Sequence, residues 1–67
     1  MPEVFRRLDP PRSVLVRHDD GRWYTGSCSG WTRQPEGGWR AIVEYTAAVG
    51  SKYVRAVDPE HVELVGE

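Results

Sequence analysis

The chain has 67 residues, a single cysteine and a net charge of −1. This length allows one domain, near the lower limit for folding without a disulfide or a metal, and the sequence offers neither of these. Cys28 has no partner cysteine, no Cys/His set has zinc spacing, and the near-neutral charge argues against a strong nucleic-acid binder.

The composition favours strands over helices. Valine is the commonest apolar residue, and three Trp and three Tyr can each bury a large area in a small core. No apolar run approaches the roughly 20 residues of a membrane span, and no signal-peptide region is visible. We therefore expect a cytoplasmic monomer with no membrane segment, no metal and no cofactor.

Residues 1–12 are expected to form an N-terminal arm. Val4, Phe5 and Leu8 are spaced for one face of a helical turn, which Pro10 and Pro11 would end. A docked turn of helix and a frayed terminus are the two alternatives, and the residues leave both open.

A β-hairpin is expected next. Residues 13–17 are rich in β-branched side chains, and Asp19-Asp20-Gly21 is typical of a tight turn. The second strand, from residue 22 to about residue 33, places Tyr24 and Cys28 on one face. A lone cysteine in such a position is usually a small buried residue.

Two further strands are predicted at residues 39–46 and 52–57, after a turn at residues 34–38 and a connector at residues 47–51. The third strand alternates well and favours period 2 over a helix. The residues that these alternations are expected to turn inward are Val16, Cys28, Ala41, Val43 and Val54.

The stretch Asp58-Pro59-Glu60-His61 predicts a single 3₁₀ turn, with Asp58 as its cap and Pro59 at the first helical position. Residues 62–64 return as a short fifth strand. Five short strands in so few residues predict an all-β fold, a small five-stranded antiparallel barrel over residues 13–65 with residues 66–67 as a tail.

The order of these features resembles the Src-homology-3-like small barrels, and within them the Tudor-like group. The resemblance is carried by residues 14–16, 20–24, 41–46 and 58–64. Tudor domains that read methylated lysine or arginine use an aromatic cage, and Tyr24 and Tyr45 match two of its positions. Arg17 and His18 stand where another aromatic residue is expected. The resemblance implies a small binding barrel, and barrels of this type host many unrelated partners.

No combination of residues indicates catalysis. His18 and His61 are the only histidines, and neither lies in a motif with a nucleophile or a metal-binding set. We therefore expect a non-enzymatic module that binds a protein or peptide partner.

The predicted binding site is one rim of the barrel, where the end of strand one, the start of strand two and the end of strand three meet. Trp23, Tyr24 and Tyr45 would supply aromatic faces there, Arg17 a guanidinium and His18 an imidazole. Because an imidazole gains charge below about pH 6.5, an acidic or phosphorylated partner would bind more tightly at lower pH.

The alternative function is a nucleic-acid-binding barrel. Eight of the nine basic residues are arginines, concentrated in the N-terminal half, and exposed Trp rings could stack on bases. The candidate contacts are Arg6, Arg7, Arg12, Arg22 and Arg33. Contacts with phosphates would make the affinity fall steeply with salt concentration.

Overall fold

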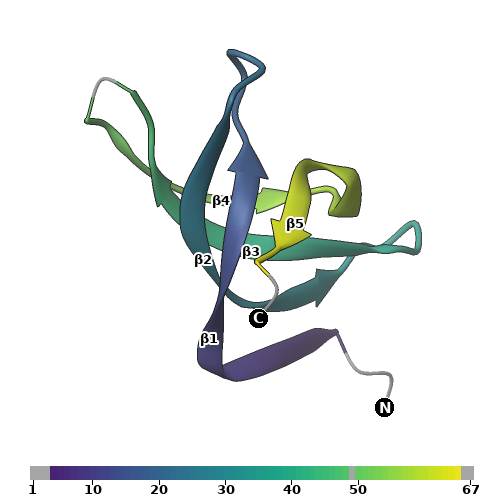
Figure 1. Cartoon of the computed structure of the whole chain (residues 1–67). Coiled ribbons are helices and arrows are strands. Elements are labelled where there is room, and N and C mark those ends of the chain that lie inside the picture. Colours follow the sequence, from purple (N-terminus) through teal and green to yellow (C-terminus); the bar gives the residue numbers. More distant parts are fainter. Residues whose placement is uncertain (1–3, 49, 66–67) are drawn as a thin grey trace.

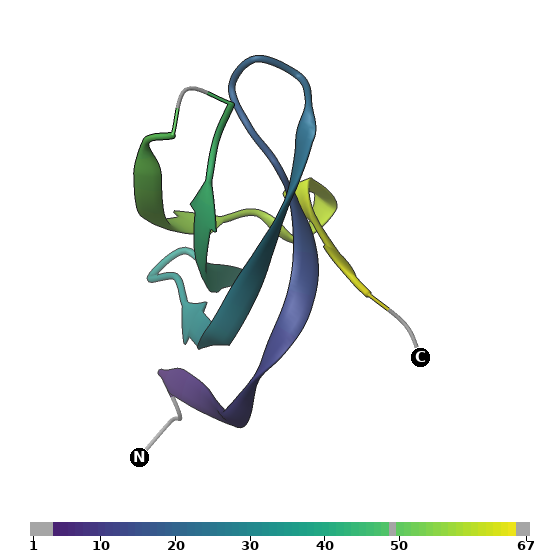
Figure 2. The ribbon, with the colours of Figure 1, turned by 60° about the vertical axis from the view of Figure 1, so that its left-hand side comes forward.

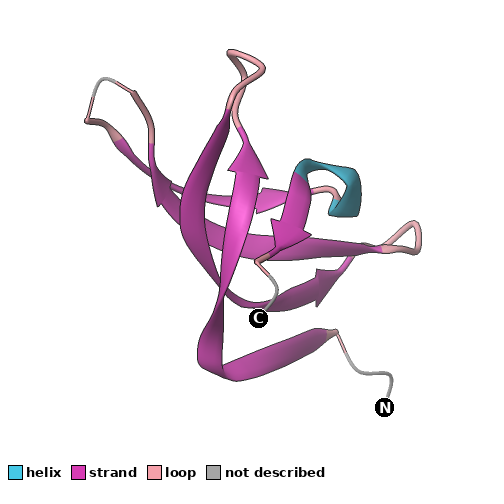
Figure 3. Cartoon of the chain, viewed as in Figure 1, coloured by secondary structure: helices cyan, strands magenta, loops and turns pink. Residues whose placement is uncertain are grey.

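The structure is a computed structural model that describes residues 4–48 and 50–65. Residues 1–3 and 66–67, the ends of the predicted arm and tail, lie outside the described residues. The fold is all-β: five antiparallel strands form one curled sheet, a half-barrel (Figure 1). Within the described residues, the one helical element is a short 3₁₀ turn before the last strand (Figure 3).

The strands are β1 (Phe5–Arg17), β2 (Trp23–Arg33), β3 (Trp39–Thr46), β4 (Lys52–Val57) and β5 (Val62–Leu64), with the 3₁₀ turn η1 (Pro59–His61) between the last two. Their order in the sheet is β4-β3-β2-β1-β5. The two edge strands, β4 and β5, are joined by η1 alone, which the curl of the sheet makes possible (Figure 2). The described part of the chain contains no helix with the length and apolar character needed to cross a membrane.

The predicted turn between β1 and β2 is confirmed. The Gly21 N–H donates to the carbonyl of His18 at 2.9 Å, and the His18 N–H donates to the carbonyl of Arg22 at 2.8 Å. Gly21 has a φ of +83°, a conformation that side chains disfavour. Asp20 Oδ1 accepts the Arg22 N–H at 2.9 Å, so the aspartate stabilises the turn as expected.

Neither alternative for the N-terminal arm, a docked turn of helix or a frayed terminus, holds for residues 5–12, which are part of a strand. Strand β1 begins at Phe5, and its first residues pair with the end of β2, for example Arg6 opposite Trp31. The register then shifts between Arg7 and Arg12, where β1 bends sharply (Figure 1). Three apolar residues cannot offset the cost of nucleating a helix, whereas β2 is long enough to offer hydrogen bonds to an extended segment.

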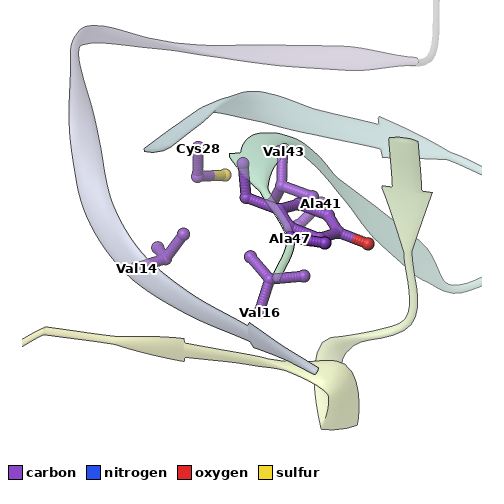
Figure 4. Close-up of a cluster of buried hydrophobic side chains, with 7 residues drawn as sticks. Val14, Val16, Cys28, Ala41, Val43 and Ala47 are labelled. Atoms are coloured by element: carbon purple, nitrogen blue, oxygen red, sulfur yellow. The ribbon is translucent and has the colours of Figure 1, made fainter. Parts of the chain in front are cut away.

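The core lies on the concave face of the sheet. Its buried hydrophobic residues are Val14, Val16, Cys28, Ala41, Val43, Tyr45 and Ala47, and most are small (Figure 4). Four of the five predicted inward residues belong to this set: Val16, Cys28, Ala41 and Val43. The alternation predicted for β1 and β3 is therefore confirmed.

Val54 is the wrong member of the predicted core, because 70% of its surface is exposed. In the register of β4 with β3, Val54 lies opposite Glu44, whereas Tyr53 lies opposite the buried Tyr45. Directly paired residues share a face of the sheet, so β4 turns Tyr53 and Arg55 towards the concave side. Alternation within β4 defines its two faces, but the register with β3 decides which of them is inward.

The predicted turn at residues 59–61 is confirmed, but the predicted cap is not. Asp58 precedes η1 without a side-chain capping hydrogen bond. Its carboxylate instead accepts the Nε of Arg40 at 3.1 Å. The carboxylate thus makes its charge-assisted hydrogen bond to a side chain of β3 and not to the backbone of the turn.

The two valines provide a test of the face assignment. Val43→Ala should lower the free energy of unfolding by about 1–3 kcal/mol, because it leaves a cavity in a small core. Val54→Ala, the matched control on β4, should change it by less than about 0.5 kcal/mol. Urea denaturation followed by tryptophan fluorescence measures both, and equal effects would contradict the assignment.

Candidate functional site

Four aromatic side chains meet at the end of the half-barrel that carries the β1–β2 turn: His18, Tyr24, Tyr45 and Tyr53. We call them the rim cluster. His18 follows β1, Tyr24 begins β2, Tyr45 ends β3 and Tyr53 begins β4. Because neighbouring strands are antiparallel, these four strand ends lie at the same end of the sheet (Figure 2). The prediction that strands one, two and three meet at one rim is confirmed.

The His18 ring lies at the centre of the rim cluster. Its centroid is 5.8 Å from Tyr24, 5.6 Å from Tyr45 and 4.7 Å from Tyr53, with edge-on geometry towards the first two. Nδ1 of His18 lies 2.7 Å from the Tyr45 hydroxyl, in a hydrogen bond. Tyr45 also stacks on Tyr53, with centroids 5.5 Å apart, and burial raises the pKa of the Tyr45 hydroxyl.

The two aspartates of the β1–β2 turn place negative charges beside the rim cluster, and each forms a hydrogen bond with a neighbouring side chain. The Tyr24 hydroxyl donates to Asp20 Oδ2 at 2.6 Å, which lowers the pKa of that carboxyl and raises the pKa of Tyr24. Asp19 accepts two hydrogen bonds from Arg55, both 3.2 Å, and they hold its pKa below the ordinary value. The Arg55 guanidinium lies 4.7 Å from the centroid of the Tyr53 ring, a cation–π contact.

A polar cleft of about 510 Å³ opens beside the rim cluster. It lies where the edge strand β4, the turn η1 and the end of β1 face one another, and its walls carry both signs of charge. The lining residues are Arg17, His18, Asp19, Gly21, Arg40, Arg55, Ala56, Val57, Asp58 and His61. A volume of this size is within the range of small-ligand and peptide side-chain sites.

The structure brings together four of the five residues predicted for the binding site. His18, Tyr24 and Tyr45 belong to the rim cluster, and Arg17 lines the adjoining cleft. Trp23 does not join them, because it alternates with Tyr24 and therefore lies on the convex face, 41% exposed.

Tyr53 and Arg55 are not among the predicted site residues, because an inward Val54 would turn both of them outward. The register of β4 with β3 instead turns them to the concave face. The available signal was Tyr45, because an aromatic residue on one strand pairs well with another directly opposite. Tyr53 is half-buried, and the side chain of Arg55 is 33% exposed.

The candidate nucleic-acid contacts do not form one surface. Arg6 lies over the Trp39 ring, 5.7 Å from its centroid, and lines a separate apolar groove together with Leu8, Trp31 and Pro59. Arg33 lies opposite Trp39 in the register of β2 with β3 and lines a different pocket, beside the β2–β3 turn. Arg7 and Arg12 flank the bend of β1, and Arg22 lies in the β1–β2 turn at the opposite end of the sheet.

The described residues contain no group of three or more His, Cys, Asp or Glu side chains placed to hold a metal ion. Cys28 is buried, as predicted, and its thiol donates to the carbonyl of Gly30 at 3.3 Å. His18 is engaged with tyrosines, and the thiol lies inside the core.

Comparison with known proteins identifies no relative: the chain matches no protein-family model, no curated protein and no solved structure.

The Asp19–Arg55 contact predicts a pH-dependent part of the stability. Because the pKa of Asp19 is lower in the folded protein than in the unfolded chain, this part is present at neutral pH. It is lost as the pH falls below about 4, through the lowered pKa. Wild type should therefore exceed Asp19→Asn in free energy of unfolding at pH 7, and the difference should shrink towards pH 2.

Chemical denaturation at a series of pH values measures this difference. As a control, 1 M salt at pH 7 should also reduce it, because exposed charges are screened. A difference that grows on acidification would contradict the assigned ion pair.

Proposed function

We propose that the chain is a non-enzymatic binding module that recognises a protein or peptide partner at the rim cluster and the adjoining cleft. The observation that carries this proposal is the meeting of three tyrosine rings, an imidazole and the Arg55 guanidinium at one end of the half-barrel. Tyrosine and arginine are the residues in which binding energy concentrates at protein interfaces.

The backbone beside the cleft supports a peptide as the partner. Strand β4 is an edge of the sheet, and Arg55, Ala56 and Val57 on this strand line the cleft. An extended peptide can pair with such an edge through main-chain hydrogen bonds while its side chains enter the neighbouring pocket. The edge strand would then supply affinity, and the rim cluster would supply selectivity.

The half-barrel is also proposed to be a Src-homology-3-like barrel of the Tudor-like group. The strand order, with a 3₁₀ turn before a last strand that pairs with β1, is compatible with this assignment. Tyr24 and Tyr45, which match two cage positions, do lie together, with centroids 6.3 Å apart. The His18 ring packs against both, so a methylated cation is not the ligand that we propose.

One observation favours the alternative of single-stranded nucleic acid. The groove of Arg6, Trp31 and Trp39 places a guanidinium beside two indole rings, which is the kind of platform on which bases stack. This groove is distinct from the rim cluster. The same experiment can therefore separate the two functions by the place where the ligand binds.

The test selects peptides from a random display library on the purified chain and maps the enriched peptides by two-dimensional NMR. Expected shifts are at His18, Tyr24, Tyr53 and Arg55. Tyr53→Ala should weaken binding at least tenfold, the loss typical of an aromatic hot spot. Val54→Ala, the neighbouring exposed residue on the opposite face, is the matched control and should leave the affinity unchanged. Tyr45 is unsuitable for this test because it belongs to the core.

Shifts confined to β5 and the β2–β3 turn, away from the rim cluster and the cleft, would contradict the proposed site. A parallel titration with single- and double-stranded oligonucleotides at two salt concentrations addresses the alternative. Shifts at Trp31 and Trp39, with an affinity that falls steeply with salt, would favour nucleic-acid binding instead.

A further inference from the structure

Arg55 forms a bidentate contact with a carboxylate of its own chain. Nη1 lies 3.2 Å from Asp19 Oδ1, and Nη2 lies 3.2 Å from Asp19 Oδ2. The partners come from β4 and from the β1–β2 turn, 36 residues apart in the sequence. Two parallel hydrogen bonds are the geometry in which a guanidinium recognises any carboxylate, including one supplied by another molecule.

The two halves of this pair are held unequally. The side chain of Arg55 is 33% exposed, and its guanidinium rests against the Tyr53 ring at 4.7 Å. The side chain of Asp19 is 78% exposed and lies in a turn, and among the described residues only Arg55 donates side-chain hydrogen bonds to it. The guanidinium is thus the fixed partner, and the carboxylate is the one that can leave.

The charged residues around Arg55 favour an anionic ligand at the position that the Asp19 carboxylate occupies. Arg17 lines the same cleft and forms no ion pair with another described residue. Arg40 is paired with Asp58, so its charge is balanced. When Asp19 leaves, Arg55 has no ion-pair partner among the described residues, and Arg17 is a second cation that lines the cleft. Asp20, the other carboxylate of the turn, is held by the Tyr24 hydroxyl. A ligand that carries carboxylates meets the two cations, whereas a basic ligand is repelled.

We propose that Arg55 is a carboxylate-binding site which Asp19 fills in the free protein, and that the partner is an acidic peptide segment whose Asp or Glu side chain takes the place of Asp19. This inference rests on the proposed function and names the chemistry of its partner. Asp19 acts as an internal competitor. One ion pair replaces another at Arg55, so the net affinity comes from the additional contacts with Arg17 and the tyrosine rings.

The turn provides a matched pair of variants for the test. Asp19→Asn removes the competing charge, and Asp20→Asn makes the same change in net charge one residue away. Asp20 contacts the Tyr24 hydroxyl and the Arg22 N–H but not Arg55. An effect of Asp19 that Asp20 does not reproduce therefore reports competition at Arg55 and not the overall charge.

The probe is a capped tetraglutamate peptide, with tetraglutamine and tetralysine as controls, titrated into the full chain and followed by NMR, including the Arg55 Nε resonance. Tetraglutamate should shift Arg55 and Tyr53, and the controls should not. Asp19→Asn should bind tetraglutamate roughly two- to fivefold more tightly. This is the change in affinity expected when an exposed ion pair no longer has to be broken before the peptide binds. Asp20→Asn should leave the affinity nearly unchanged, and Arg55→Lys, which keeps the charge but loses the fork, should weaken it.

Equal effects of Asp19→Asn and Asp20→Asn on the affinity for tetraglutamate, or no shift of the Arg55 resonance, would contradict the proposal that a partner carboxylate replaces Asp19 at Arg55. The proposed function would still stand if library-selected peptides of other chemistry shifted the rim cluster, and it would fail separately if none did. Asp19→Ser serves as a second variant should Asp19→Asn disturb the turn, and the dispersion of its spectrum verifies folding before any titration.

Discussion

At Gly26, strand β2 comes so close to β3 that a Cβ atom would lie 2.5 Å from the carbonyl oxygen of Glu44 and 2.7 Å from the Cβ of Tyr45. No larger residue fits this position without moving backbone. Gly26 pairs with Tyr45 in β3 and with Val14 in β1, so it lies on the concave face in the middle of the sheet. This close approach lets the sheet curl strongly and lets the Tyr45 ring turn into the core.

The position of Tyr45 in turn determines what the open end of the half-barrel contains. The core beneath it is built from small side chains, chiefly Val14, Val16 and Val43, which leave room for only one large ring. His18 and Tyr53 then pack around Tyr45 and cover it. The same rings close the core on one side and face the cleft on the other. A binding surface at this place needs no residues beyond those that already stabilise the fold.

Among the described residues, two ion pairs that line the cleft join separate elements. Arg55 connects β4 to the β1–β2 turn, and Arg40 connects β3 to the segment before η1. Both pairs are substantially exposed, so their contribution to stability is small. In the proposed mode of binding, a carboxylate of the partner takes over the contact that Asp19 makes with Arg55.

The sequence by itself determined the local elements. The Asp-Asp-Gly turn, the period-2 alternation of residues 39–46 and the Asp58-Pro59 turn each encode their structure within a few residues, and all three occur. Tertiary structure alone decided the path of residues 5–12 and the orientation of β4. Alternation along a strand defines its two faces but not which of them is inward. A shift of one residue in the pairing of β4 with β3 would turn Val54 inward and Tyr53 and Arg55 outward. Three of the four members of the rim cluster were thus predicted. Tyr53 and the adjacent Arg55 were not, because the face that β4 turns inward depends on its register with β3 and not on the alternation of β4 alone.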